Sequence, residues 1–195
     1  MFGSIFEVIW LIGLIVGSVN RAIYARRPKK DEITVDSNTR VERLLLFLSS
    51  LGLIVLPLFY VFSPWLDFAD YQLPFWAGWF GVAIFAFALW LLWRSHADLG
   101  RNFTPTIQLK EKHTLVTHGV FGYIRHPIYA AHGLWGIAQA LLLQNWIAGL
   151  SMLVFFLPLY LARVPNEEKM MLEHFGEVYR VYMDQTGRLI PRFRR

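Results

Sequence analysis

Hydrophobic and polar positions alternate along this chain in long blocks. Five apolar blocks cover about residues 5–22, 42–62, 74–95, 128–143 and 146–163. A helix needs roughly 20 apolar residues to cross the hydrocarbon core of a bilayer. The first three blocks have about that length, and the shorter last two are joined by a very short polar turn, which predicts a helical hairpin. The pattern predicts an all-α integral membrane protein with five transmembrane helices in one membrane domain over 1–195.

Charged residues are divided unevenly among the polar stretches. Lys and Arg gather after the first block, after the third block and in the tail from Arg163, whereas the stretch between the second and third blocks holds only Asp67 and Asp70. An excess of Lys and Arg marks the cytoplasmic side of a membrane protein. We therefore expect a multi-pass protein with its N-terminus outside and its C-terminus in the cytoplasm. The polar segments 96–127 and 164–195 are then cytoplasmic and are the expected catalytic segments. The first block lacks the basic start of a signal peptide.

Composition narrows the chemistry. The chain is 55% hydrophobic, has a net charge of +5 and contains no cysteine, which excludes disulfides, thiolate metal sites and cysteine nucleophiles. Its six histidines show no metal-site spacing, so no metal is expected. No glycine-rich nucleotide loop, GxSxG motif or nucleic-acid motif is present. The expected partner is the lipid bilayer and not a nucleic acid, and any cofactor needs a pocket built by the two polar segments together.

Counting across the hairpin brings two polar side chains together. His126 precedes the fourth block and Arg163 follows the fifth, and the midpoint between them falls on the turn at 144–145. Antiparallel helices of equal length end level with each other, so both side chains should reach the same depth. Pro165 is expected to end the fifth helix and to begin a new one, with Glu167 in its first turn. Gly176 is expected to divide the tail into two short helices.

Simpler interpretations of these residues stay open at this point. His126 and Pro127 are also typical of an ordinary helix start, and Arg125 of a topology charge. The apolar stripe of the tail also suits a helix lying on the membrane surface. His132, inside the fourth block, should face a protein interior or a ligand path and not lipid. Asp98 and Asn102 are expected to cap or orient the loop after the third block.

Three segments together resemble a known family. The stretches "LGRNF", "HTLVTHGVFGYIRHPIY" and "RVPNEEKMMLEHFGEVYRVYM" are similar to isoprenylcysteine carboxyl methyltransferases and to the related membrane phospholipid methyltransferases. The likeness covers about Leu99 to Pro191, and the RHPxY and RxxxEE elements are specific in combination and order. The N-terminal half resembles the family in hydropathy alone, and five spans resemble its smaller prokaryotic members.

The resemblance implies a cofactor, a pocket and roles for residues. The cofactor would be S-adenosylmethionine, bound in a cytoplasmic pocket formed by the 94–127 loop and the C-terminal tail. Arg163 would face the acceptor substrate, and Arg163 and Glu167 would be the catalytic residues. Phe121 stands where the family usually has tyrosine, so stacking would remain without a hydroxyl contact. The implied cofactor-binding residues are Gln108, His113, Thr114, Leu115, Val116, Phe121, His126, Pro127, Ile128, Tyr129 and Glu167.

The acceptor is the least determined part of this reading. A carboxylate of a prenylcysteine-like, lipophilic or lipidated acceptor is favoured, because it is ionised at neutral pH and needs no general base. A phospholipid amine is the alternative, and its methylation would require a base to remove a proton. An NADPH-dependent membrane reductase and a non-catalytic membrane scaffold also remain compatible with the sequence, which does not indicate an oligomeric state.

Overall fold

The computed structural model describes residues 4–25, 33–36, 39–100, 108–110 and 114–192. Most of them form helices. In chain order the elements are α1 (Ile5–Ala25), β1 (Ile33–Asp36), α2 (Arg40–Ser50), the π-turn η1 (Leu51–Val55), α3 (Leu56–Phe62), the 3-10 helix η2 (Pro64–Ala69), α4 (Phe75–Leu99), β2 (Gln108–Lys110), the 3-10 helix η4 (Gly119–Gly122), α5 (Pro127–Leu143), α6 (Ser151–Phe175) and α7 (Glu177–Gln185).

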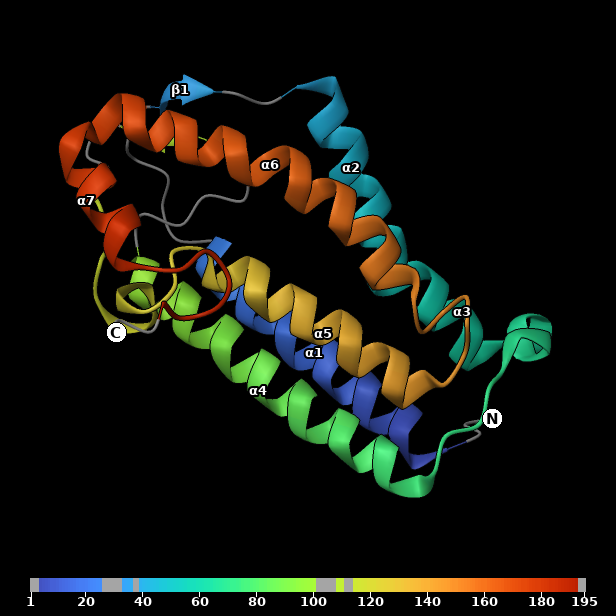
Figure 1. The fold of residues 1–195 in the computed structure, drawn as a ribbon. Coiled ribbons are helices and arrows are strands. Elements are labelled where there is room, and N and C mark those ends of the chain that lie inside the picture. The colour runs from blue at the N-terminus through green and yellow to red at the C-terminus, as the bar shows by residue number, and fades with distance from the viewer. Residues whose placement is uncertain (1–3, 26–32, 37–38, 101–107, 111–113, 193–195) are drawn as a thin grey trace.

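The long helices form two layers. Helices α1, α4 and α5 lie side by side in one layer, and α6 packs along α2 and η1 in the other (Figure 1). The first layer is held by aromatic packing, because Phe85 of α4 meets Trp135 of α5 edge to face with ring centroids 4.8 Å apart. Gly13 and Gly17 of α1 face these two rings, and a Cβ at either glycine would overlap them. The two layers meet near the turn after α5 and separate toward the end that carries α7.

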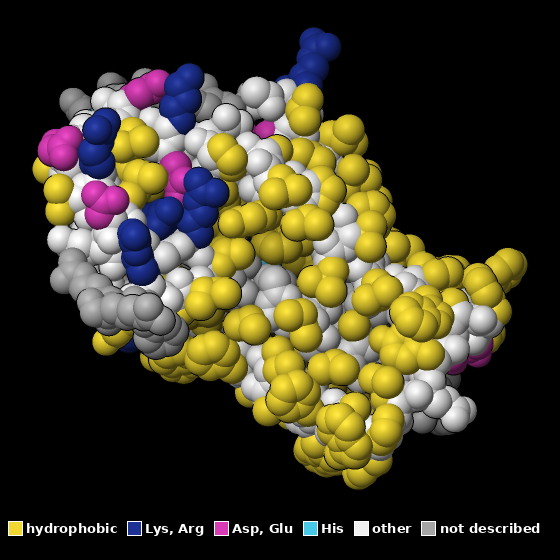
Figure 2. Space-filling model, in the orientation of Figure 1, with side chains coloured by type: hydrophobic (Ala, Val, Ile, Leu, Met, Phe, Trp, Pro, Cys, Tyr) yellow, Lys and Arg dark blue, Asp and Glu magenta, His cyan; other side chains and the backbone are white. Residues whose placement is uncertain are grey.

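The outer surface of the helices is apolar. Three helical stretches, Ile5–Ala25, Arg40–Phe62 and Phe75–Leu99, are long and apolar enough to cross a membrane. Apolar side chains cover most of the face shown in Figure 2, and the Lys, Arg, Asp and Glu side chains gather at the end near α7. A face this apolar is costly in water and favourable in lipid. The protein is therefore an integral membrane protein.

A proline in the second apolar stretch creates a hydrogen-bonded link between the layers. Pro57 has no N–H, and the N–H of Leu56 is bonded to the carbonyl of Leu51 across η1. The carbonyl of Gly52 therefore has no helical donor. It accepts hydrogen bonds from Ser151 Oγ of α6 at 2.7 Å and from Gln139 Nε2 of α5 at 3.1 Å. Three helices are thus fastened at one level, near the end where the layers meet.

The predicted hairpin turn lies where expected. Gln144 adopts a left-handed conformation with φ 48° and ends α5. The side chain of Asn145 donates to the carbonyl of Leu66 and to Asp70, and it accepts from the N–H groups of Ile147 and Ala148. The turn is longer than the sequence indicates, because residues 146–150 form hydrogen-bonded turns and α6 begins only at Ser151.

The expectation that Pro165 begins a new helix is wrong. Helix α6 continues through both Pro158 and Pro165 to Phe175. Pro165 lies on the exposed face of α6, whereas Val164 and Glu168 are buried on the face that packs against the rest of the protein. The burial of that packed face, together with the ion pair between Arg163 and Glu167 one turn apart, offsets the lost backbone hydrogen bond. The predicted break at Gly176 is present, with φ 55° at the junction between α6 and α7.

The prediction of a helical protein is confirmed, and the structure adds one pair of short strands that the sequence did not predict. Strands β1 and β2 pair antiparallel, with Ile33 opposite Lys110 and Asp36 opposite Gln108. The β-branched run Ile-Thr-Val explains why this part of the linker favours an extended conformation. The pairing joins the linker after α1 to the loop after α4, so the two polar connections lie together at the α7 end.

Candidate active site

A pocket of about 370 Å³ lies between the two layers at their separated end. Its walls come from α1, α2, η1, α4, α5, α6, α7 and the loop before α5. One part is apolar and lies among the long helices, where Leu14, Leu53, Met152 and Phe156 line it. The other part is more polar and lies beside the loop, η4 and α7, where Thr114, His126 and Glu167 line it together with Val116, Phe121, Tyr179 and Tyr182. The volume is in the range typical of small-molecule sites.

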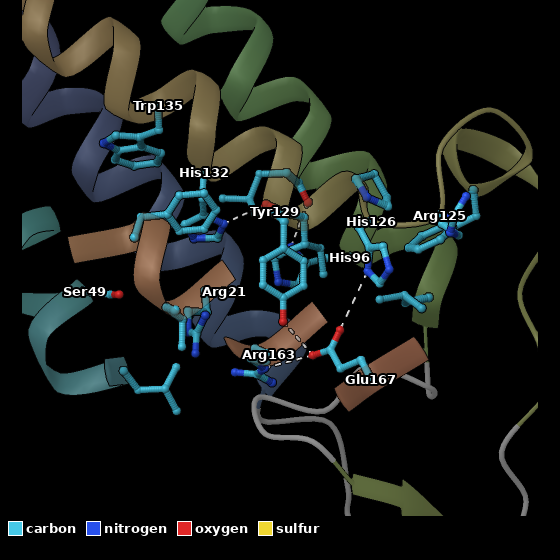
Figure 3. Close-up of a pocket in the computed structure, with 18 of the residues that line it drawn as sticks. Arg21, Ser49, His96, Arg125, His126, Tyr129, His132, Trp135, Arg163 and Glu167 are labelled. Atoms are coloured by element: carbon cyan, nitrogen blue, oxygen red, sulfur yellow. Dashed lines mark hydrogen bonds and ion pairs between the residues drawn. The ribbon is translucent and has the colours of Figure 1, made fainter. Parts of the chain in front are cut away.

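Glu167 is the centre of the polar contacts where the two parts join. Its Oε1 accepts a hydrogen bond from the Tyr129 hydroxyl at 2.6 Å and from Arg163 Nε at 2.8 Å. Its Oε2 lies 3.8 Å from His126 Nδ1. Figure 3 shows Tyr129 of α5 and His126, the residue before α5, reaching toward Arg163 and Glu167 on α6. The alignment predicted from counting across the hairpin is therefore present, because His126 and Arg163 meet the same carboxylate.

Glu168, the next residue, holds a second network outside the pocket. Its buried carboxylate accepts hydrogen bonds from Arg125 Nε at 2.7 Å and from His126 Nε2 at 3.2 Å. Arg188 contacts both of its oxygens. Burial by itself would raise the pKa of Glu168, but the hydrogen bonds from His126, Arg188 and Arg125 outweigh it and lower the pKa to about 2. The carboxylate therefore stays charged at neutral pH.

The C-terminal segment after α7 is bound to the start of α5 by backbone hydrogen bonds. The N–H of Arg125 donates to the carbonyl of Gly187, and the N–H of His126 donates to the carbonyl of Arg188. Arg125 Nη1 also donates to the carbonyl of Thr186. Arg125 is thus a supporting residue that joins the tail to the loop, and Pro127 at the first position of α5 fixes where the helix begins.

Most of the sequence-predicted site residues line this pocket. They are Thr114, Leu115, Val116, Phe121, His126, Pro127, Ile128, Tyr129, Arg163 and Glu167. The side chain of Gln108 and all of His113 lie outside the described residues, as does Asn102. Asp98 orients the loop as predicted, because it accepts a hydrogen bond from the N–H of Val120 at 2.9 Å. His132 also lines the pocket, and its Nδ1 contacts the carbonyl of Ile128.

Sequence reasoning missed two charged residues, one that contacts Arg163 and one that lines the pocket. Glu42 lies 3.6 Å from Arg163 Nη1, and the N–H of Glu42 is capped by Thr39 Oγ1. The spacing Thr-x-x-Glu before an apolar run is a capping-box signature, which signals the helix start but not the contact with Arg163. Arg21 of α1 also lines the pocket, although the sequence suggests only a topology charge there. Among the residues that the structure describes, none form a cluster suited to a metal ion.

The fold and the site together define a class of protein. It is a helical membrane protein with one pocket, which has an apolar part among the helices and a polar part at one end. Where the two parts join, the RHPxY element contacts the RxxxEE element.

Comparison with known proteins agrees with this class. The model of the isoprenylcysteine carboxyl methyltransferase (ICMT) family matches residues 80–173. Protein-S-isoprenylcysteine O-methyltransferase A of Arabidopsis thaliana is 32% identical over 94 residues, covering 47% of this chain and 48% of that protein. The Homo sapiens protein-S-isoprenylcysteine O-methyltransferase is 28% identical over 138 residues, covering 66% of this chain and 49% of that protein. The chain spans about half the length of the curated relatives it matches.

A solved structure extends the likeness to the whole fold. The structure of the eukaryotic intramembrane Ras methyltransferase ICMT, without a monobody, superposes with a TM-score of 0.60 at 23% identity, covering 94% of this chain and 63% of that one. The N-terminal half, which the sequence related to the family by hydropathy alone, therefore shares the fold. Residues 80–173 are thus similar to the isoprenylcysteine carboxyl methyltransferase family.

Proposed function

We propose that this protein is a membrane methyltransferase that transfers a methyl group from S-adenosylmethionine to the carboxylate of a lipophilic, prenylcysteine-like acceptor. The observation that carries the proposal is the continuity of the pocket. A single cavity joins a polar part, suited to a charged cofactor, to an apolar part among the helices, suited to a lipid tail. The family match and the names of the relatives support the same reaction class.

The polar part has groups that complement the charged groups and the adenine ring of S-adenosylmethionine. The Glu167 carboxylate offers a negative charge for its ammonium or sulfonium group. The first turn of α5, which begins at Pro127, offers the positive end of a helix for its carboxylate. Phe121, Tyr179 and Tyr182 offer aromatic faces for its adenine ring. When bound, the cofactor supplies a methyl group on a positively charged sulfur, and that sulfur leaves readily as a neutral thioether.

The residues of the chain act mainly by positioning the two substrates. Tyr129 and Arg163 hold Glu167 in one orientation, and the hydrogen bond from His126 to Glu168 fixes the imidazole beside it. Arg163 presents its guanidinium at the junction of the two parts, where it would orient an acceptor carboxylate for in-line attack on the methyl group. The apolar wall around this junction excludes water, which strengthens these charge interactions.

The contacts of Glu167 favour a carboxylate acceptor over an amine. An amine must lose a proton before it can be methylated, and the obvious base at the junction is Glu167. Oε1 of that carboxylate already accepts hydrogen bonds from the Tyr129 hydroxyl and from Arg163, so this oxygen is occupied and does not face an amine substrate with a free lone pair. A carboxylate nucleophile needs no base. The family match likewise favours a methyltransferase over a nicotinamide-dependent reductase or a scaffold.

We further propose that five helices cross the membrane, with the N-terminus outside and the pocket and C-terminus in the cytoplasm. The gathering of charged side chains near α7 supports this orientation, since Lys and Arg are retained on the cytoplasmic side. Helix α5 and the first part of α6 would supply the fourth and fifth crossings. Figure 1 shows α5 running alongside α1 and α4, two of the three helices that have the length and apolarity of a span.

The test of this assignment compares two substitutions at the junction. Arg163→Ala should lower kcat/KM for the acceptor by about 10- to 100-fold, because a charged hydrogen-bond partner is lost. Glu167→Gln should weaken binding of S-adenosylhomocysteine by a similar factor, measured by calorimetry on detergent-solubilised protein. Glu173→Gln, an exposed position on the same helix, is the matched control and should change neither quantity. Unchanged acceptor kinetics in Arg163→Ala would refute the acceptor role.

A further inference from the structure

One cation in the pocket wall has no part in the contacts described above. Arg21 projects from α1 into the pocket, and Figure 3 shows it between Ser49 and Arg163. Its side chain is exposed, and the space that it borders is the pocket. Within the described part of the chain, no acidic side chain forms an ion pair with it. A guanidinium that faces a pocket without a carboxylate partner can bind an anionic group of a ligand.

Arg163 is in a different electrostatic situation. Glu167 and Glu42 lie 2.8 and 3.6 Å from its guanidinium nitrogens, so two carboxylates already balance its charge. Arg21 is close enough to Arg163 for the two charges to repel each other. The charge of Arg21 is not balanced in this way by any ion pair among the described residues. A negatively charged ligand group beside Arg21 would be attracted by its guanidinium and would offset the repulsion from Arg163.

The neighbours of Arg21 indicate what kind of anion fits. One turn away on the same face of α1, Gly17 and Ser18 line the pocket, and Leu14 continues that face into the apolar part. Trp135 and Met152 line the apolar part from the other layer. A molecule with its apolar tail in this part would present its polar head at the level of Arg21. The lining thus fits a carboxylate attached to a long hydrocarbon.

We propose that Arg21 binds the carboxylate of the acceptor and that it selects the acid over the methylated product. This inference rests on the proposed function. Before the reaction the acceptor carries a negative charge, which pairs with Arg21. The carboxylate oxygen forms a bond to the methyl carbon while the bond from that carbon to sulfur breaks, which leaves the neutral sulfur of S-adenosylhomocysteine and a neutral ester. The pairing with Arg21 is then lost. The loss of this single charge interaction would then favour release of the product into the membrane.

The experiment measures binding of an N-acetylated S-prenylcysteine and of its methyl ester by detergent-solubilised protein. The wild-type protein should bind the acid about 10- to 100-fold more tightly than the ester, the range expected for one charged hydrogen bond. Arg21→Gln should lose most of this preference through weaker binding of the acid, and Arg21→Lys should keep part of it. Arg43→Gln, an exposed arginine on α2 outside the pocket, is the matched control and should behave as the wild type.

Binding of S-adenosylhomocysteine verifies that each variant is folded, and it should not change. If Arg21→Gln retains the wild-type preference for the acid, Arg21 does not bind the acceptor, although the wild-type protein can still be a methyltransferase. If the wild-type protein binds neither compound and transfers no methyl group to the acid, the proposed function is wrong and this inference is wrong with it.

Discussion

At the scale of single residues, two adjacent glutamates have separate partners. Glu167 faces the pocket with Tyr129 and Arg163, whereas Glu168 faces the loop and tail with Arg125 and Arg188. His126 lies between them and contacts both carboxylates. This arrangement explains why the RHPxY and RxxxEE elements occur together, because the polar side chains of one are paired with those of the other.

The contacts of Glu167 could be predicted from the sequence, and those of Glu168 could not. His126 and Arg163 flank a hairpin, so counting residues was enough to bring them together. Arg188 follows α7, and its approach to Glu168 depends on how the chain returns past the start of α5. Arg21 and Glu42 were missed for the same reason, since their roles depend on where α1 and α2 pack.

The low pKa of Glu168 predicts how stability changes in acid. Its carboxylate is more acidic in the folded protein than in the unfolded chain, where the ordinary value is 4.5. The stabilisation is therefore complete above about pH 4.5 and is lost as the pH falls toward 2, to a total of up to about 3 kcal/mol. Apparent unfolding midpoints of detergent-solubilised protein between pH 2 and 7 should decrease less in Glu168→Gln than in the wild type.

Glu177→Gln provides the control for this measurement. Glu177 is an exposed carboxylate of α7 that is only weakly paired with Arg180, and its replacement should leave the wild-type pH profile unchanged. Parallel acid profiles in the wild type and Glu168→Gln would show that the Glu168 network does not stabilise the tail.

At the scale of helices and strands, hydropathy and spacing predicted the order of the long helices but not all of their ends. The bounds of the apolar blocks agree closely with those of α1, α4 and α5, because a helix that crosses a membrane must be apolar along its length. Pro165 did not end α6, because packing of the buried face outweighed one missing hydrogen bond. The pairing of β1 with β2 joins distant segments, and the sequence carries no signal for such a pairing beyond local extended propensity.

The contact at Gly52 predicts a clear difference between two glycine substitutions. A Cβ at Gly52 would lie 2.5 Å from the backbone carbonyl oxygen of Ser151, so Gly52→Ala should force η1 and α6 apart and destabilise the protein by about 1–3 kcal/mol. At Gly133, on α5, the nearest atom to a Cβ is 3.8 Å away, and Gly133→Ala should be neutral or slightly stabilising. Thermal unfolding in detergent measures both, and equal midpoints would contradict the close packing at η1.

At the scale of the whole molecule, the two layers are joined at one end and open at the other. The bonds at Gly52 and Asn145 fasten the joined end, and the polar connections and α7 surround the open end. The pocket therefore extends from the polar connections at the open end to the apolar side chains among the helices. This division also follows the charges, which gather at the open end.

The absence of cysteine from the sequence allows a direct test of the proposed orientation. Trp65 lies in η2, and Gln185 ends α7, and both are exposed. Trp65→Cys should react with a membrane-impermeant maleimide on intact cells, and Gln185→Cys should react only after the membrane is opened. Labelling of both cysteines from the same side would contradict an odd number of crossings between them.

The central claim is tested most directly by supplying the purified wild-type protein with methyl-labelled S-adenosylmethionine and an N-acetylated S-prenylcysteine. The account predicts transfer of the label to the acceptor in a form that mild base releases as methanol, because a carboxyl methyl ester is hydrolysed under those conditions. Transfer to a lipid amine in a base-stable form, or no transfer to any prenylcysteine by protein that binds S-adenosylhomocysteine, would contradict it.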